Sequence, residues 1–260
     1  MSFNAQPPSA PDQPPAPSEV PGLRKRYRRT PMVTYTLLGI TIVLFAMQWV
    51  AGATSGGAVT ELGVKYGPAI AAGEWWRLIT PVFLHASPLH LAFNMYALFL
   101  MGPTLERYYG NLRFLALYLL AGFAGNVVSL VFMPAVPSLG ASTAIFGLLA
   151  AQGVFIYHNR AFIGPDARRG LINIMMVAVV NFVIGVAGSA YIDNFGHLGG
   201  LLGGLIFAWL GGPLLEVRTT GFSNPVLVDR RSQQEVLLAG LADFLLFATV
   251  AIYWYLKYPR

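Results

Sequence analysis

The chain has 260 residues, of which 55% are hydrophobic and only 11% are charged. This composition excludes an ordinary soluble protein, and the length accommodates about six or seven membrane spans with little left for a separate soluble domain. The absence of cysteine excludes disulfides, thiolate metal sites and a cysteine nucleophile. The net charge of +6 comes from short basic clusters beside apolar runs, which indicates membrane orientation and not binding of nucleic acid.

Residues 1–30 are rich in proline and contain a basic cluster between Arg24 and Arg29. A segment of this composition cannot form a packed core, so we predict a disordered cytoplasmic tail. The basic cluster follows the proline-rich part and no cleavage site follows a short apolar region, which does not fit a secretory signal. Binding of a partner to the prolines remains an alternative.

Seven apolar runs follow and are interpreted as membrane-spanning helices. They cover about 33–51, 86–105, 112–133, 141–158, 170–188, 194–211 and 236–256. The connection from 52 to 84 is long and contains Trp75 and Trp76, which predicts a partly embedded interfacial structure anchored by aromatic rings and not substrate contacts. No strand is expected. The chain is therefore predicted to be an all-α, polytopic membrane helix bundle.

Lysine and arginine are distributed unevenly between the alternate flanks of these runs. Thirteen lie on the side of the N-terminal tail and four on the other side. The positive-inside rule then places the N-terminus in the cytoplasm and the C-terminus outside. The seventh run carries Asp243 in its middle, and if this run does not span the membrane the C-terminus is cytoplasmic instead.

Four polar residues lie near one end of the apolar runs: His90, Asn94, Ser142 and His197. In the predicted orientation the second, fourth and sixth runs all enter from outside, so the four residues share one outer layer of the membrane. Polar groups at membrane depth are costly and indicate function. Chance placement would scatter them between the two faces.

Ser142 and His197 suit nucleophilic catalysis, because a serine hydroxyl needs a base such as histidine to take its proton. Ser142 begins a run, where helix N–H groups and the positive end of the helix dipole help to hold an oxyanion. His90 and Asn94 are four residues apart, so they face one side of a helix and supply further donors. Nucleophile, base and oxyanion donors are thus expected to converge from three helices.

Each of these residues also has a structural explanation. Serine is a favoured helix N-cap, and His197 can be an interhelical hydrogen-bonding residue, as can His90 and Asn94. Glycines around His197 form two offset four-residue repeats: Gly196, Gly200 and Gly204, and Gly199 and Gly203. Such repeats let membrane helices pack backbone to backbone, so the sixth run is expected to lie close to the fourth.

Other polar residues near these positions are expected to stay outside the chemistry. His85, at the outer mouth, is expected to be solvated or interfacial. Asp193 resembles the acid of a triad, but capping of the sixth run together with Asn194 is favoured. Glu106 and Arg107 close the second run at the opposite side, where a structural ion pair or hydrogen bond is expected. No His-Glu-x-x-His pattern occurs, so neither a metal site nor any cofactor is indicated.

In combination, four motifs resemble the rhomboid family of intramembrane serine proteases, over most of residues 33–212. They are Trp76-Arg77 in the first long loop, His90-x-x-x-Asn94, Gly140-x-Ser142 and His197-x-x-Gly200. Their order among six spans makes the combination specific, whereas any one motif alone is weak.

The resemblance implies hydrolysis of peptide bonds in or near transmembrane segments of protein substrates, within the lipid bilayer. It implies a dyad without a required third acid, in which Ser142 is the nucleophile and His197 the general base. It also implies an oxyanion site made by the Ser142 backbone N–H with His90 and Asn94.

Further residues match the family pattern or depart from it. Phe146 occupies the position of an aromatic residue that stacks near the catalytic histidine, and Gly140 and Gly200 belong to the supporting motifs. The family's Gly-x-Ser-Gly ends here in Thr143. A β-branched residue at this place is bulkier and is expected to crowd either the substrate or the helix packing.

The resemblance and the runs predict four parts: a disordered, basic cytoplasmic tail (1–30), a rhomboid-like six-span catalytic core (31–212), a cytoplasmic loop (213–235) and a seventh transmembrane helix (236–260). This matches a "six plus one" arrangement of the family. A bacterial inner (cell) membrane fits the short chain with its basic tail, and nothing indicates the oligomeric state.

Two other classes of function remain alternatives. A non-catalytic rhomboid-like protein that binds membrane clients typically lacks the serine or the histidine, and both are present here. A transporter with a polar relay predicts inverted repeats and polar sites near the midplane. The polar residues of this chain gather at one face instead.

Overall fold

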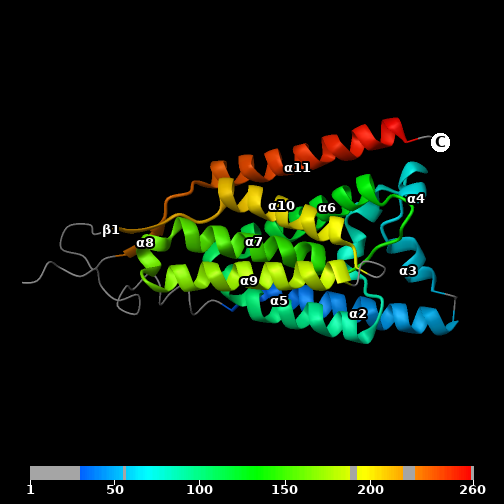
Figure 1. The fold of residues 1–260 in the computed structure, drawn as a ribbon, viewed down its shortest axis with the longest axis horizontal. Coiled ribbons are helices and arrows are strands. Elements are labelled where there is room, and N and C mark those ends of the chain that lie inside the picture. Colours follow the sequence, from blue (N-terminus) through cyan, green and yellow to red (C-terminus); the bar gives the residue numbers. More distant parts are fainter. Residues whose placement is uncertain (1–29, 55–56, 188–191, 219–225, 259–260) are drawn as a thin grey trace, which may run out of the picture.

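The computed structural model describes residues 30–54, 57–187, 192–218 and 226–258 (Figure 1). Its long helices are α2 (Met32–Thr54), α5 (Pro88–Tyr109), α6 (Asn111–Phe132), α7 (Ser142–His158), α9 (Asp166–Ala187), α10 (Asn194–Gly211) and α11 (Gln233–Lys257). The shorter elements are α3 (Ala58–Gly63), α4 (Gly67–Ala71), η2 (Trp75–Leu78), η3 (Thr80–Phe83), α8 (Arg160–Ile163), β1 (Leu215–Arg218) and β2 (Val226–Asp229).

Each of the seven predicted runs is a helix, and successive long helices run in alternating directions (Figure 1). By length and composition α2, α6 and α11 can cross a membrane, with mean hydropathies of 1.8, 2.0 and 2.2. The buried share of the apolar window is 67% in α6 but 17% in α2 and 22% in α11. Helix α6 is therefore central and the other two are peripheral. The long helices, with apolar spans among them, confirm the predicted helical membrane bundle.

The glycines of α10 allow it to lie against two helices at once. A Cβ atom on Gly200 would overlap the carbonyl oxygen of Thr143, and one on Gly204 would overlap the backbone of Gly147, both in α7. A Cβ on Gly199 would lie 2.7 Å from the carbonyl oxygen of Ala124 in α6. The two repeats thus face different neighbours, and the predicted close contact of the sixth run with the fourth is present.

The connection between α2 and α5 folds into α3, α4, η2 and η3 and is held by Arg77. The Arg77 guanidinium donates to the carbonyl oxygens of Glu61 (2.6 Å) and Val64 (2.9 Å) and pairs with Glu74 (2.6 Å). The Trp76 indole donates to a carbonyl of α3, at Leu62 (3.0 Å). The part of this connection that the structure describes, from Gly57 onward, is therefore held by the buried guanidinium of Arg77.

The expectation that the chain has no strand is wrong. Strands β1 and β2 pair antiparallel, with Leu215 opposite Asp229 and Arg218 opposite Val226. The strands have four residues each, so no long apolar run marks them. The alternation of apolar and charged residues in Leu215–Arg218 is the signal that was available.

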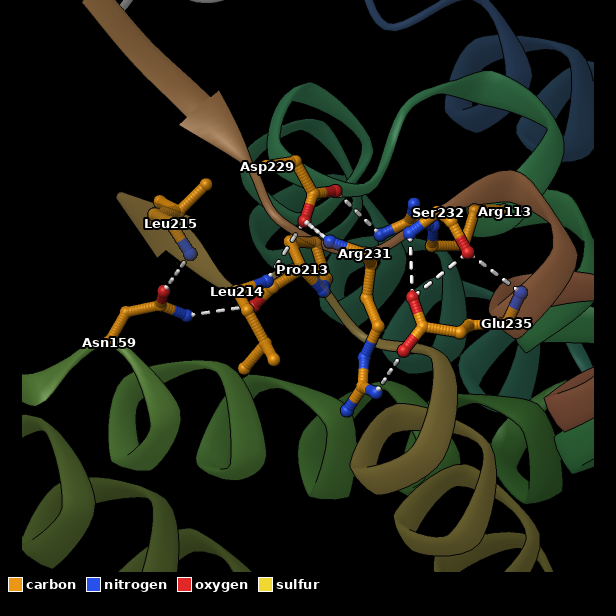
Figure 2. Close-up of polar contacts among 9 residues, drawn as sticks. All are labelled: Arg113, Asn159, Pro213, Leu214, Leu215, Asp229, Arg231, Ser232 and Glu235. Atoms are coloured by element: carbon orange, nitrogen blue, oxygen red, sulfur yellow. Dashed lines mark hydrogen bonds and ion pairs between the residues drawn. The ribbon is translucent and has the colours of Figure 1, made fainter. Parts of the chain in front are cut away.

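Polar contacts connect this hairpin to the ends of several helices (Figure 2). The Asp229 carboxylate pairs with Arg113 of α6 (2.9 Å) and accepts from the backbone N–H groups of Leu214 and Arg231 (both 3.0 Å). Asn159, at the end of α7, donates to the carbonyl oxygen of Pro213 (3.1 Å). We call this end of the bundle the hairpin end.

Two helix starts at the hairpin end are capped by carboxylates. Buried Glu106 of α5 accepts hydrogen bonds from the backbone of Val33 (2.8 Å) and Thr34 (2.7 Å), the first turn of α2. Ser232 and Glu235 form a capping box at the start of α11 (Figure 2). The expected structural hydrogen bond of Glu106 is therefore present.

Candidate functional site

Ser142 is the first residue of α7, at the end of the bundle opposite the hairpin. The chain reaches it through Gly140, whose φ of +136° is a conformation that favours glycine. The Gly140 N–H donates to the carbonyl oxygen of Pro81 (2.9 Å). The N-cap is Ala141 and not Ser142, so the alternative in which the serine serves as the cap is wrong.

His197 lies in the first turn of α10 and contacts the serine directly. Its Nε2 atom is 2.8 Å from Oγ of Ser142. The imidazole stacks on the ring of Phe146, with centroids 4.3 Å apart and planes 14° from parallel. A serine and a histidine on neighbouring helices meet only when the backbones are close, and Gly200 provides that closeness against α7.

Asp193 is the N-cap of α10, as predicted. Its Oδ1 atom accepts from the backbone N–H of Gly196 (2.8 Å), and its Oδ2 atom accepts from the hydroxyl of Ser129 in α6. Both oxygens therefore have structural partners at the start of the helix. The carboxylate fixes the first turn of α10, on which His197 lies.

His90 lies beside the backbone that enters Ser142. A Cβ atom on Gly140 would be 2.8 Å from both Cε1 and Nε2 of the His90 ring and 3.6 Å from Oγ of Ser142. The Nδ1 atom of His90 accepts from the Ala86 N–H at 3.5 Å. In that tautomer the proton is on Nε2, which makes the atom nearest Gly140 a hydrogen-bond donor.

Asn94 lies one turn further along α5 and is buried. Its amide group donates to the carbonyl oxygen of His90 (2.9 Å). One amide N–H is thus used within the helix, and the group offers a second. The structure therefore brings Ser142, His197 and His90 together. Asn94 is bonded to the backbone of His90, one turn along the same helix.

His85 is not solvated, contrary to expectation: its exposed fraction is 2%. Its Nε2 atom accepts from the backbone N–H of Ala141 at 3.4 Å, and its ring lies 5.0 Å from that of His90. Gln48 of α2 holds the His85 backbone by accepting from its N–H (3.0 Å). Burial lowers the pKa of His85 to about 3, so the neutral ring remains an acceptor for the amide beside the nucleophile.

The sequence contained a signal for the burial of His85. The residue directly follows the apolar stretch from Ile79 to Leu84, of which Leu84 is 4% exposed. His85 is thus a site residue that the prediction missed.

Thr143 crowds helix packing and not the space beside His90. Its side chain lies between Gly125 of α6 and Gly196 of α10. A Cβ on Gly125 would be 2.6 Å from Cβ of Thr143, and one on Gly196 would be 3.1 Å from its Cγ2. Among the described residues the hydroxyl of Thr143 has no hydrogen-bond partner. Two glycines therefore provide the room that the threonine occupies.

A cavity of about 330 Å³ lies beside His90. One wall is the segment that joins α6 to α7, including Ser138 and Leu139, and another is the start of α10, including Asp193 and Phe195. Within the described ranges no group of three or more histidine, aspartate or glutamate side chains is arranged to hold a metal ion. We call the end of the bundle that carries Ser142, His197 and this cavity the serine end.

Fold and site together define a polytopic helical membrane protein with a serine–histidine pair, an adjacent second histidine and a cavity at one end. The model of the Rhomboid domain matches residues 72–214, which is more than half of the chain. The chain belongs to the rhomboid family and is an integral membrane protein.

Individual relatives support this membership. The chain is 42% identical over 179 residues to the rhomboid protease GluP of Bacillus subtilis (strain 168), which covers 68% of this chain and 34% of GluP. It is 35% identical over 187 residues to YdcA of the same bacterium, provisionally named a rhomboid protease, covering 70% of this chain and 89% of YdcA. Rhomboid-like protease 3 of Toxoplasma gondii is 34% identical over 145 residues, 55% of this chain and 54% of that protein.

Proposed function

We propose that this protein is an intramembrane serine endopeptidase that cleaves peptide bonds in or near transmembrane segments of membrane proteins. The observation that carries the proposal is the 2.8 Å contact between Nε2 of His197 and Oγ of Ser142. The names of GluP and Rhomboid-like protease 3 as proteases support it. Ser142 and His197 are then the nucleophile and the general base.

In the first half of the reaction, Nε2 of His197 takes the proton of Ser142 as Oγ attacks the substrate carbonyl carbon. The negative charge then develops on the carbonyl oxygen. The backbone N–H of Ser142 is one of the first N–H groups of α7, which have no acceptor within the helix. This N–H, Nε2–H of His90 and the free N–H of Asn94 are proposed to stabilise the oxyanion.

His197 then gives its proton to the leaving amine, which departs and leaves the acyl group on Oγ of Ser142. In the second half, His197 takes a proton from the water that attacks the acyl carbon and returns it to Oγ as the carboxylic acid product leaves. Both oxygens of Asp193 are occupied by Gly196 and Ser129, which supports a dyad without a third acid. The stacked ring of Phe146 is proposed to hold the imidazole in its place. The cavity beside His90 has Ser138 and Leu139, shortly before Ser142 in the chain, in one wall, and it is proposed to admit water and an unwound substrate segment.

We further propose that the N-terminus is cytoplasmic, that the serine end faces outward and that the membrane is a bacterial inner membrane. The helix ends near the hairpin carry the arginines Arg107, Arg113, Arg160, Arg169 and Arg231, which supports this orientation. In this reading 31–212 is the catalytic core, 213–235 is cytoplasmic and 236–260 is the seventh span.

The test is cleavage of a model transmembrane substrate by purified protein. Ser142→Ala and His197→Ala are expected to abolish cleavage while the folded fraction is unchanged. Matched controls at the hairpin end are Ser232→Ala and His158→Ala, which remove the same side chains far from the site and should leave the rate intact. Cleavage by Ser142→Ala at the parental rate contradicts the proposal.

A serine-directed fluorophosphonate probe separates this function from non-catalytic client binding. An active nucleophile predicts labelling of the parent and not of Ser142→Ala. A folded parent that takes no label and cleaves nothing supports the alternative, a rhomboid-like protein that binds membrane clients.

A further inference from the structure

Lys65 is a completely buried lysine in the connection between α3 and α4, with an exposed fraction of 0%. A lysine is almost never fully buried unless its ammonium group has partners. Here Nζ donates to the carbonyl oxygens of Met133 (2.8 Å) and Val136 (2.7 Å). Both acceptors belong to the segment that joins α6 to α7, which we call the 133–140 segment.

The backbone on either side of Lys65 is bonded to the same segment. Lys65 and Ser138 exchange two hydrogen bonds, of 2.9 and 3.0 Å, and the N–H of Gly67 donates to the carbonyl oxygen of Pro134 (2.8 Å). Gly67 is required for this approach, because a Cβ there would be 2.7 Å from that oxygen. The ammonium group thus binds carbonyl oxygens of a segment whose backbone is also bonded to Lys65, to Gly67 and, at Gly140, to Pro81.

The 133–140 segment ends at the nucleophile. Beyond Ser138 it reaches Gly140, then Ala141, whose N–H faces His85, and then Ser142. Ser138 and Leu139 also form a wall of the cavity beside His90. A change in the conformation of this segment therefore moves both the backbone that enters the serine and the wall that faces the substrate.

We propose that Lys65 is a positioning residue for proteolysis: by binding two carbonyl oxygens of the 133–140 segment, its ammonium group fixes the cavity wall and the backbone entering Ser142. The inference rests on the proposed function, which supplies the reaction that it affects. The backbone of Lys65 is itself held, since Arg77 donates to the carbonyl oxygen of the preceding Val64.

Burial disfavours the charged form of Lys65 and lowers its pKa to about 8. Asp193, on another wall of the cavity, attracts the ammonium group and opposes this shift. His90 is the other titratable group that lines the cavity. Ammonium and amine forms both donate to carbonyl oxygens, so the positioning does not depend on the charge alone.

The experiment compares Lys65→Met, Lys65→Arg and the parent by the rate of fluorophosphonate labelling at Ser142 and by kcat/KM on a model transmembrane substrate. Lys65→Met keeps an unbranched side chain, one heavy atom shorter than that of lysine, but has no donor. We expect both quantities to fall between about tenfold and a hundredfold in Lys65→Met, the scale at which displaced catalytic groups lose rate. Lys65→Arg retains donors and is expected to recover part of the loss.

A matched control separates positioning from general destabilisation. Asn159→Ala removes hydrogen bonds to Phe155, Pro213 and Leu215 at the hairpin end. It should lower the thermal midpoint and leave the labelling rate of the folded protein at the parental value. Hydrogen exchange adds a direct readout, since the amides of Ser138 and Gly140 should exchange faster in Lys65→Met than in Asn159→Ala.

The outcomes distinguish the two proposals. Parental labelling and unchanged exchange at Ser138 and Gly140 in Lys65→Met overturn the role of Lys65 while leaving the proposed function intact. A parent that takes no label overturns the proposed function, and the exchange data still report on the segment. If Lys65→Met does not fold, Lys65→Arg and Lys65→Gln replace it, and equal labelling and exchange in both and the parent overturn the positioning role.

Discussion

At the hairpin end of the bundle, carboxylates are bonded to arginine or to helix starts, whereas at the serine end Ser142 and His197 are bonded to each other. Asp229 has three partners, and Glu106 binds the first turn of α2 through both carboxylate oxygens. Buried polar atoms without a hydrogen-bond partner among the described residues occur at both ends, at Oγ1 of Thr143 and at Nδ1 of His158. Carboxylate contacts thus hold helices together at the hairpin end, whereas the contact at the serine end joins a hydroxyl to a base.

Helix positions at the two ends are set by different forces as well. Ion pairs and caps connect helices at the hairpin end, while glycine contacts bring α10 against α6 and α7 at the serine end. Steric fit is short-ranged, so a small change at the serine end should affect catalysis first. A lost ion pair at the hairpin end should affect stability first. Three substitutions test this difference.

The largest effect is expected for Gly200→Ala. The new methyl group would overlap the carbonyl oxygen of Thr143, and neither backbone can yield without separating α10 from α7. We expect loss of detectable cleavage, because His197 moves away from Ser142, together with destabilisation of about 3 kcal/mol. Cleavage of a model substrate and thermal unfolding in one detergent measure both effects.

Gly39→Ala in α2 is the matched control, since a Cβ there meets nothing within 4 Å. Its activity and thermal midpoint should stay at or slightly above the parental values, because alanine favours a helix over glycine. A Gly200→Ala variant with parental activity shows that close helix contact does not set the geometry of the serine end.

A smaller effect, confined to stability, is expected for Asp229→Ala. The substitution leaves Arg113 without its carboxylate where its side chain is only 13% exposed, and two backbone N–H groups lose their acceptor. We expect destabilisation of about 2–3 kcal/mol, less than for a fully buried pair. The cleavage rate per folded molecule should be unchanged well below the thermal midpoint.

Glu216→Ala on the same hairpin is the control for charge. Glu216 pairs with exposed Arg218 and Arg230 at 3.9 and 3.4 Å, so its removal should cost at most about 1 kcal/mol. If Asp229→Ala lowers the cleavage rate of the folded protein as strongly as it lowers stability, the two ends are coupled, and the separation drawn between them is wrong.

The sequence predicted those features whose signals are local. Long apolar runs gave all seven long helices, because a membrane span must satisfy its own backbone within one helix. The contact of Ser142 with His197 was predicted from motifs that lie at the starts of two such helices. The cap by Asp193 followed from the preference of aspartate for that position.

Features that depend on distant parts of the chain could not be predicted. Lys65 binds carbonyl oxygens of residues 68 and 71 positions away, and no periodicity marks such a contact. The hydrogen bonds of His85 with Gln48 and Ala141 join it to two other parts of the chain, so no local signal marks these contacts. The hairpin was not predicted, because two paired strands of four residues each leave only a weak alternation of apolar and charged residues in the sequence.

The smallest effect is expected at Thr143, where the sequence departs from the glycine of the family motif. Thr143→Gly removes three heavy side-chain atoms (Cβ, Oγ1 and Cγ2) from a slot between Gly125 and Gly196 and loosens the first turn of α7. We expect destabilisation of about 1–2 kcal/mol and a loss of severalfold in kcat/KM. Restoring the family glycine should therefore impair this protein.

Thr143→Val sharpens that prediction, because valine keeps the shape of threonine and lacks only the hydroxyl. Since Oγ1 has no partner among the described residues, the valine variant should match the parent in kcat/KM and equal or exceed it in stability. A valine variant as impaired as the glycine variant shows that the hydroxyl takes part in the reaction. A glycine variant faster than the parent shows instead that Thr143 obstructs the substrate. In that case the slot formed by Gly125 and Gly196 does not explain why this chain has threonine where the family motif has glycine.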